Sequence, residues 1–248
     1  MKGDRAGAPL VANSVSHSYG NVHVLKDLNL EVKVGEVVVI VGPSGCGKTT
    51  LLNLFSGHIN PTTGSIQREG LVRTVYQHDG LFPWLTVAEN ISMGLRSISD
   101  KGQLEKELQE LLALIHMEDF KNHYPHEISG GMRQRAELAR VLAGDSDILL
   151  MDEPFSALDY QARLRMRREL NRLLHTRPRT VVFVTHDIEE AAQLADRVLV
   201  LSTRPATICR ELKISVPRPR GLTDPSVIEA MTEILKELGL HTNDATEV

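Results

Sequence analysis

A glycine-rich run near the start of the chain has the residue types that bind phosphate. Residues 42–49, Gly-Pro-Ser-Gly-Cys-Gly-Lys-Thr, match the pattern G-x-x-x-x-G-K-[ST]. Glycines let the backbone wrap around an anion, so that N–H groups and the N-terminus of a following helix point at its oxygens. Lys48 would reach the β- and γ-phosphates, and the Thr49 hydroxyl would ligate Mg²⁺. The run predicts binding of ATP or GTP with Mg²⁺, and its candidate residues are Gly42, Pro43, Ser44, Gly45, Cys46, Gly47, Lys48, Thr49 and Thr50.

Two acidic residues, Asp152 and Glu153, follow a short apolar run that begins at Ile148. A buried strand would present both side chains at its carboxyl end. Asp152 could hold Mg²⁺ through a water molecule, and Glu153 could polarise an attacking water. The alternative is an acidic pair that caps the next turn, which Pro154 would permit. Taken together with Lys48, the pair indicates nucleotide hydrolysis.

A third candidate is the tripeptide Ser129-Gly130-Gly131, which opens a predicted helix ahead of the two acids. Its N–H groups, its hydroxyl and the helix dipole could bind an anion. As a lone tripeptide it is more often an ordinary helix N-cap.

The apolar pattern predicts the elements that would position these residues. We expect strands at 22–34, 36–41, 147–151 and 181–185, and helices at 48–56, 104–116, 131–143, 161–175 and 188–194. Alternating strands and helices build a largely parallel sheet with both faces covered. The glycine-rich run would lie between a strand and a helix, which argues against a plain glycine-rich turn. The stretch from Leu85 to Ala143 has helical signals only, so we expect a helical insertion.

The C-terminal part of the chain is predicted to end in a separate helix. Residues 217–221, Pro-Arg-Pro-Arg-Gly, resemble a linker, and Asp224 followed by Pro225 is typical of a helix start. An apolar stripe then leads to Gly239, and its residues are Val227, Ile228, Met231, Ile234, Leu235 and Leu238. We expect the stripe to dock on its own domain; a regulatory or dimerising tail is the alternative.

Composition limits the function classes. The 248 residues carry 28 Lys and Arg against 32 Asp and Glu, a net charge of −4, which argues against a role in coating nucleic acid. The apolar runs are too short to span a bilayer, and the N-terminus lacks a secretory signal. The two cysteines, Cys46 and Cys209, form no spaced metal or disulfide framework. We therefore expect an intracellular soluble domain.

The motifs in combination resemble an ATP-binding-cassette (ABC) ATPase. The set covers nearly the whole chain in the family's order and consists of Tyr19, residues 42–49, Gln77, Ser129-Gly-Gly, Asp152-Glu153, Ser156-Ala-Leu-Asp159 and His186. The wordings PSGCGKTTLL and ISGGMRQR, with the segment 76–90, resemble the nitrate, sulfonate and taurine importer ATPases in particular. The resemblance implies an α/β P-loop NTPase fold, the ABC nucleotide-binding domain, with an antiparallel β edge and an inserted helical subdomain. The implied domain covers 10–240, with a core of 10–80 and 144–216, a helical subdomain of about 81–143 and a C-terminal helix at 224–239.

The resemblance also implies roles for single residues. Two cassettes would pair head to tail, and Ser129, Gly130 and Gly131 would contact the γ-phosphate held by the opposite copy. Gln77 would touch Mg²⁺ or water and couple to the membrane subunits; a surface glutamine after a strand is the alternative. Asp159 would communicate across the dimer, although a helix-capping aspartate fits the same run.

Two further roles concern the nucleotide directly. His186 would hydrogen-bond the γ-phosphate and Glu153 from the end of a parallel strand, a favoured place for ligand contacts. Tyr19 would stack on adenine, and a partly buried core tyrosine is the alternative. Residues 128–132, Ile-Ser-Gly-Gly-Met, correspond to the family's signature segment. Its fifth position is Met132 where Gln is common, and a thioether cannot donate a hydrogen bond.

Two further features each allow more than one interpretation. Trp84, the one tryptophan, could pack inside the helical insertion or anchor a partner helix. One predicted helix carries five arginines, which we interpret as a solvated face in preference to a membrane or nucleic-acid contact: Arg163, Arg165, Arg167, Arg168 and Arg172.

We predict an ATPase that uses MgATP to drive an importer of a small anionic solute such as nitrate, a sulfonate or taurine. Its expected partners are transmembrane permease subunits, a second copy of itself and, indirectly, a solute-binding protein, with no nucleic acid. Its expected place is the cytoplasmic face of the membrane, as a peripheral subunit. The alternatives are a soluble ABC-type ATPase not coupled to transport and a small-molecule P-loop kinase, which would leave Ser129-Gly-Gly unexplained.

Overall fold

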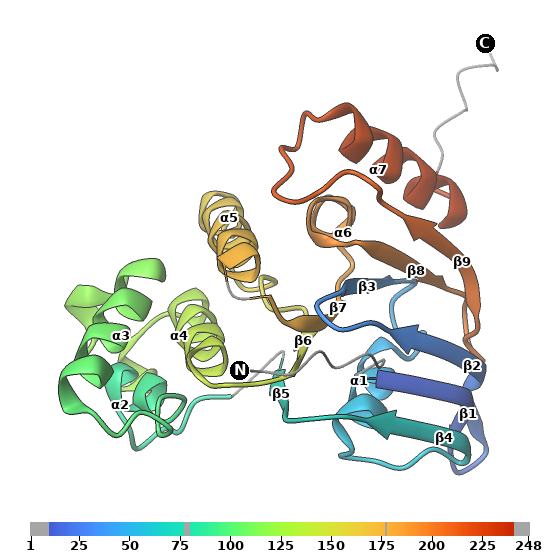
Figure 1. The fold of residues 1–248 in the computed structure, drawn as a ribbon. Helices are drawn as coiled ribbons and strands as arrows, with labels where there is room; N and C mark the ends of the chain where they lie inside the picture. The colour runs from blue at the N-terminus through green and yellow to red at the C-terminus, as the bar shows by residue number, and fades with distance from the viewer. Residues whose placement is uncertain (1–9, 77–79, 177, 241–248) are drawn as a thin grey trace. The chain divides into compact units, whose positions relative to one another are not determined.

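The computed structural model describes residues 10–76, 80–176 and 178–240, so Gln77 lies outside the described residues. The chain divides into two compact units (Figure 1). Residues 10–69 and 178–240 belong to unit 1, and residues 70–176 belong to unit 2. The helical subdomain expected at about 81–143 lies within unit 2, and its boundaries stay a prediction.

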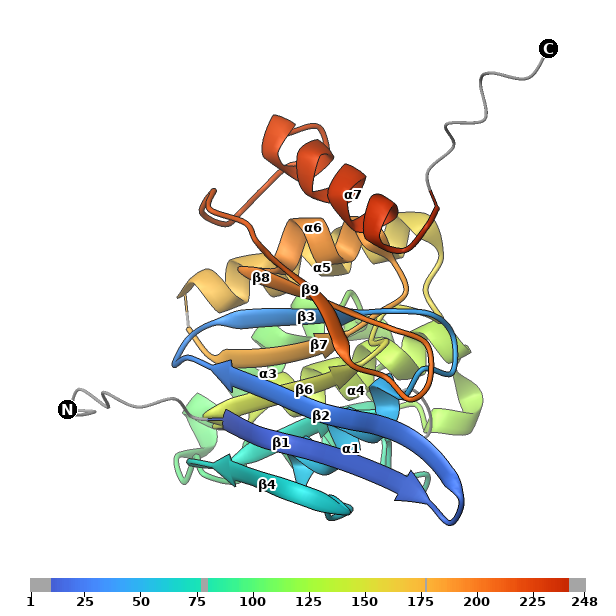
Figure 2. The ribbon, with the colours of Figure 1, turned by 90° about the vertical axis from the view of Figure 1, so that its right-hand side faces the viewer.

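Unit 1 contains a three-stranded antiparallel sheet in the order β2-β1-β4 (Figure 2). The strands are β1 (Leu10–Tyr19), β2 (Val22–Val32) and β4 (Thr63–Arg68). β1 and β2 form a hairpin in which Tyr19 pairs with Val22 at the turn. The antiparallel edge expected from the family resemblance is therefore present.

Unit 1 also contains parallel strands that lead to the glycine-rich run. β3 (Val37–Val41) pairs in parallel with β7 (Thr180–Val184) and with β8 (Arg197–Leu201), and β9 (Ile208–Lys213) runs antiparallel to β8. All five residues of β3 and of β7 are buried, which explains their unbroken apolar composition. The run at 42–49 connects β3 to α1 (Lys48–Ser56), where the sequence predicts it.

The C-terminal helix α7 (Pro225–Glu237) packs on α6 (Ile188–Leu194) of the same unit (Figure 1). Val227 and Ala230 are buried in one apolar cluster with Ala192 of α6, so the predicted docking is confirmed. The prediction is wrong for Ile228. Ile228 is 53% exposed because it lies off the buried stripe, which uses Ala230 instead.

Asp224 occupies the N-cap position of α7 without capping it through its side chain. Its carboxylate accepts a hydrogen bond from Gly221 N at 2.7 Å, which closes the preceding turn. The predicted helix start at Asp224 is therefore confirmed, but the Asp224 side chain does not cap α7, because the preceding turn competes for the same oxygen atoms.

Unit 2 combines one parallel strand pair with helices. β5 (Val72–Val75) pairs with β6 (Ile148–Asp152), and between them in sequence lie α2, α3 and α4. The helices of the unit are α2 (Val87–Ser92), α3 (Lys101–Leu114), α4 (Gly130–Ala143) and α5 (Tyr160–Thr176). Among the described residues from 85 to 143 there is no strand, as the sequence predicts.

The arginines of α5 do not share one solvated face. Arg167 is 2% exposed, whereas Arg165, Arg168 and Arg172 are exposed. Arg163 is half-buried and donates to Leu158 O at 3.3 Å. The expectation of a common face is wrong because the five positions cover more than one side of a helix with 3.6 residues per turn. In the part of the chain that the structure describes, no helix is long and apolar enough to cross a membrane.

Candidate functional site

The glycine-rich run packs tightly against the antiparallel sheet of unit 1. Gly47 has φ of 120°, and a Cβ atom there would lie 2.7 Å from Val24 Cγ1 and 2.9 Å from Leu25 Cδ2. Only glycine fits this combination of positive φ and close approach. On the outer side, a Cβ at Gly45 would lie 3.0 Å from Nη2 of Arg204, so a guanidinium lies beside the loop.

Lys48 is held inside the loop that it belongs to. Its side chain is buried, and Nζ donates to Gly42 O at 2.9 Å and to Pro43 O at 3.0 Å. Thr49 follows as an exposed residue on the first turn of α1. Among the described residues no side chain caps the N-terminus of α1, where Gly47 is the N-cap. An unfilled helix N-terminus with a lysine ammonium beside it suits a phosphate group.

His186 lies at the same sheet edge as the loop. β3 and β7 are parallel neighbours with Ile40 opposite Val184, so residues that follow the two strands leave the sheet side by side. Thr185 N donates to Ile40 O at 3.2 Å and continues this pairing by one residue. His186 itself is exposed. The structure thus brings His186 and the phosphate loop to one edge of unit 1.

A hydrogen-bond network that the sequence analysis did not identify fixes the turn at His186. The Thr185 hydroxyl donates to buried Glu190 at 2.7 Å and accepts from Asp187 N at 2.9 Å. Asp187 in turn caps α6 by accepting from Glu190 N at 3.1 Å. The turn is therefore fixed on both sides of His186.

Tyr19 lies at the end of β1, at the hairpin turn of unit 1, and is 50% exposed. Its ring meets the ring of His17 edge to face, with centroids 4.7 Å apart and an angle of 83° between the planes. Half of its surface is accessible to a ligand, and the alternative of a partly buried tyrosine with a packing role also fits this exposure.

In unit 2, Asp152 and Glu153 lie at the carboxyl edge of the β5–β6 pair. Val75 is opposite Met151, so the segment that leads to Gln77 and the acidic pair emerge from adjacent strands. Asp152 is buried, and Glu153 adopts a positive φ of 47°. A positive φ is uncommon in a residue other than glycine and turns the chain sharply directly after the strand.

Gln134 lies near the start of α4 and holds the turn that follows β6 in place. Its Nε2 donates to Glu153 O at 3.0 Å, and its Oε1 accepts from Ala157 N at 2.9 Å. The Gln134 residue is buried, and both bonds are partly shielded from water. A Cβ at Gly131 would lie 3.1 Å from Ala157 O, so α4 approaches this segment closely. The signature helix and the segment after Glu153 are therefore one packed assembly.

The signature residues themselves open α4 as predicted. Ser129 is the N-cap, and its hydroxyl accepts a hydrogen bond from Met132 N at 3.3 Å. Asp159 caps the start of α5 in the same way, because Ala162 N donates to its Oδ1 at 2.9 Å. This hydrogen bond lowers the pKa of the Asp159 carboxyl. Both capping alternatives of the sequence analysis are thus realised, which leaves a second role for either residue as a proposal.

Buried Glu137 of α4 spans the segment that contains Gln77. One carboxylate oxygen accepts from Tyr76 N at 3.1 Å and the other accepts from Gly80 N at 3.2 Å. A Cβ at Gly80 would collide with this carboxylate. No motif predicts this role for Glu137, although a lone acid among the apolar positions of a helix is a signal that invites one.

Trp84 is 69% exposed, and it lies on a short loop whose backbone is held by a buried asparagine. Asn90 is fully buried; it accepts from Phe82 N at 2.8 Å and donates to Leu85 O at 3.0 Å. The Phe82 ring lies 5.5 Å from the Trp84 ring and 5.3 Å from the Arg140 guanidinium. The alternative of internal packing for Trp84 is therefore wrong, because most of its surface is exposed.

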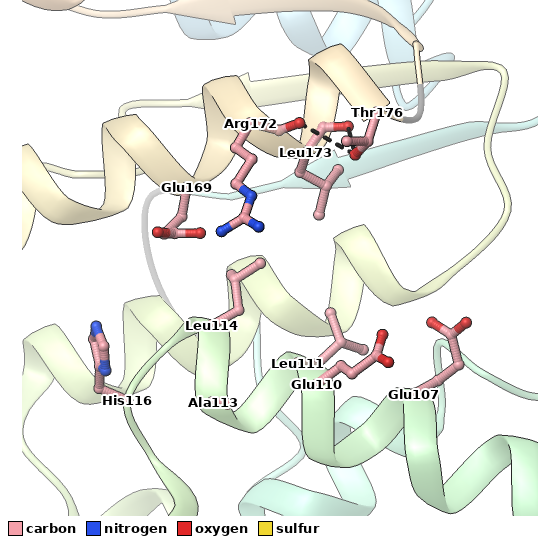
Figure 3. Close-up of a pocket in the computed structure, with 10 residues that line it drawn as sticks. All are labelled: Glu107, Glu110, Leu111, Ala113, Leu114, His116, Glu169, Arg172, Leu173 and Thr176. Carbon is pink, nitrogen blue, oxygen red and sulfur yellow. Dashed lines mark hydrogen bonds between the residues drawn. The ribbon is translucent and has the colours of Figure 1, made fainter.

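A cavity of about 510 Å³ in unit 2 is separate from all these residues. It lies between α3 and α5, and Figure 3 shows Glu169 and Arg172 projecting from α5 toward α3. Leu111, Leu114 and Leu173 supply its apolar lining. None of the predicted site residues lines it, so the candidate chemistry does not depend on this cavity.

Comparison with protein families decides among the P-loop classes. The family model described as ABC transporter matches residues 25–156. The chain belongs to the ABC transporter family. The aliphatic sulfonates import ATP-binding protein SsuB 2 of Pseudomonas syringae pv. tomato is 42% identical to this ABC cassette over 216 residues, which cover 87% of this chain and 91% of that protein. The taurine import ATP-binding protein TauB of Pelagibacter ubique is 41% identical over 202 residues, or 78% of this chain and 76% of that protein.

A solved structure of similar fold is the ATP-binding cassette MJ0796, a dimer in a post-hydrolysis state with ADP and Pi. It has a TM-score of 0.74 and 31% sequence identity, and the match covers 86% of this chain and 99% of MJ0796. The comparisons confirm the ABC resemblance, the α/β cassette fold and the prediction of an importer-type ATPase that hydrolyses ATP. They leave open the roles of single residues.

Proposed function

We propose that this ABC cassette hydrolyses MgATP to power the import of a small anionic solute of the sulfonate, taurine or nitrate class. The relatives named for aliphatic sulfonate and taurine import support the solute class, since they match most of the chain. The main structural support for ATP use is the loop at 42–49 with its buried Lys48. The loop lies at the same sheet edge as His186.

In this proposal the residues of unit 1 bind the nucleotide. The N–H groups of the loop and the Lys48 ammonium surround the phosphates, Tyr19 stacks on adenine and His186 contacts the γ-phosphate. The fixed turn around His186 supports the last role, because an exposed side chain on a rigid turn is already oriented toward a ligand.

The residues of unit 2 would supply the reaction chemistry. Glu153 is the general base that orients and polarises the attacking water, and Gln134 positions it through the backbone. Asp152 and Gln77, with Thr49 contributed by the phosphate loop, would hold Mg²⁺, which neutralises phosphate charge when bound. Hydroxyl, carboxylate and amide oxygens are the hard ligands that this cation prefers, so the donor set fits.

We propose that two copies close head to tail around two nucleotides. Ser129, Gly130 and Gly131 of one copy would contact the γ-phosphate held by the other copy. The dimeric MJ0796 cassette, which is 31% identical to this chain, supports this arrangement. The glycine N–H groups at the start of α4 suit an anion, since glycine leaves the helix N-terminus uncovered.

Trp84 is proposed as the contact with a transmembrane permease. A large aromatic side chain on a rigid loop loses little conformational freedom when a partner covers it. Trp84→Ala should weaken association with the permease by about 10-fold or more, the usual effect of removing an interface anchor. The measurement is co-purification and titration of the cassette against detergent-solubilised permease, with Tyr124→Ala as a control because Tyr124 is another exposed aromatic residue of unit 2. Unchanged affinity in the Trp84 variant would remove this residue from the interface.

The solute class is tested in vesicles that contain the permease, the cassette and the binding protein encoded with them. We expect ATP hydrolysis to rise when an alkanesulfonate or taurine is supplied, and to stay at its basal rate with a neutral sugar. A cassette that stays soluble and never associates with membranes would support the uncoupled ATPase instead. Stimulation by the sugar alone would overturn the proposed solute class.

A further inference from the structure

His17 is a buried histidine of unit 1 that no predicted role uses. It lies on β1, two residues before Tyr19, and its side chain is 8% exposed. Neither Nδ1 nor Nε2 has a hydrogen-bond partner within the described part of the chain. Buried polar groups without partners are rare and costly, so a side chain with two of them requires an explanation.

The contact that His17 does make is with the ring of Tyr19. The two rings meet edge to face at 4.7 Å and 83°. Aromatic pairs prefer this geometry because the positive ring edge faces the negative ring face, and the contact is therefore directional. A half-exposed tyrosine at a hairpin turn would otherwise sample several rotamers, so the His17 ring restricts the orientation of Tyr19.

The same position is linked to the phosphate loop. His17 lies opposite Leu25, and the pairing register shifts between His17 and Ser18, with Val24 between the two paired positions. Because of this irregularity, neighbouring residues Val24 and Leu25 both reach Gly47 of the loop. His17 therefore contacts the Tyr19 ring and pairs across the hairpin with Leu25, one of the two residues that approach the phosphate loop.

We propose that His17 is a positioning residue for Tyr19, holding its ring ready for the base while the loop holds the phosphates. The inference rests on the proposed stacking of Tyr19 on adenine. It assigns no contact between His17 and the nucleotide. It predicts that His17 contributes to the affinity for ligands that carry a base and not to the affinity for phosphate alone.

The test compares MgADP with magnesium pyrophosphate, which lacks the base, by titration calorimetry on the full chain. His17→Leu fills a similar volume without an aromatic ring, and His17→Phe restores an aromatic ring without nitrogen atoms. We expect His17→Leu to weaken MgADP binding by about 2- to 10-fold, in line with one aromatic pair. Pyrophosphate affinity should stay within about twofold of the parent, and His17→Phe should restore MgADP binding.

Two controls separate positioning from general damage. His23→Leu alters an exposed histidine of the same hairpin, which bonds Ser18 Oγ at 2.8 Å, and should leave both affinities unchanged. In a Tyr19→Ala background, His17→Leu should cause no further loss, because the two residues act through one contact. His17→Ala repeats the test with a smaller side chain, and thermal unfolding reports whether each variant is folded.

Four results would overturn the inference, and they differ in what else they affect. If Tyr19→Ala weakens MgADP but His17→Leu does not, His17 has no positioning role and the adenine contact stands. If Tyr19→Ala leaves MgADP binding intact, the proposed adenine contact fails and the inference fails with it. Equal losses for MgADP and pyrophosphate would make His17 a purely structural residue. Additive losses in the double variant would mean that His17 acts independently of Tyr19.

Discussion

The Glu153→Gln variant should hydrolyse ATP about two to four orders of magnitude more slowly than the parent, the usual contribution of a positioned base. Glutamine keeps the volume of the side chain and part of its hydrogen bonding, but it loses the negative charge and the basicity. The backbone of residue 153, which Gln134 holds by its carbonyl oxygen and which has a φ of 47°, should change little. Steady-state phosphate release is the measurement.

Nucleotide binding should survive in the same variant. The phosphate loop, Lys48 and Thr49 are unchanged, so the affinity for MgADP should stay within about threefold of the parent, as expected for a residue that acts on the water. Glu169→Gln is a matched control, since it alters another glutamate of unit 2 that lines the separate cavity. Hydrolysis at the parent rate by Glu153→Gln would remove Glu153 from the mechanism.

Lys48→Ala should lower ATP turnover by about two orders of magnitude or more, because the phosphate loses a fixed positive charge. The structure adds a second reason for a large effect. The ammonium of Lys48 bonds Gly42 O and Pro43 O, so its removal also loosens the loop that must present N–H groups to the phosphates.

Nucleotide titration and phosphate release measure this effect, with Lys33→Ala as the matched control. Lys33 is exposed and lies outside the loop, so its removal should leave both quantities unchanged. Thermal unfolding of the two variants establishes that each is folded. Normal activity in folded Lys48→Ala protein would refute the role of the loop.

Much of the fold follows from apolar periodicity and turn residues. Lys48–Ser56 and Ile188–Leu194 are helices with the predicted bounds; Gly57 ends the first in the left-handed conformation, and Asp187 caps the start of the second. The helix expected at 104–116 begins earlier, at Lys101, because Asp100 caps it by accepting from Gln103 N at 2.7 Å. A cap of this kind lies ahead of the apolar pattern and is easily missed.

The residues that support the site were harder to predict. Gln134 and Glu137 are polar side chains within a helix, and only tertiary contacts show that Gln134 bonds Glu153 and that Glu137 bonds Tyr76 and Gly80. Arg167 carries a charged side chain of the kind usually found on the surface and is nevertheless buried. In each case the sequence shows the polar group, whereas its partner comes from a distant part of the chain. The motifs therefore identify the candidate site residues, whereas the residues that hold them in place are identified only by the tertiary structure.

In the proposed dimer, each complete ATP site is shared by two copies of this chain. The most direct measurement is the mass of Glu153→Gln protein by size-exclusion chromatography with light scattering. In this variant the loss of a carboxylate beside the γ-phosphate relieves repulsion, and slow hydrolysis preserves the ATP. We predict a dimer in MgATP that dissociates in MgADP and that fails to form when Ser129→Arg crowds the opposite γ-phosphate. A slow variant that remains monomeric in MgATP at high protein concentration would contradict the shared site for the isolated subunit.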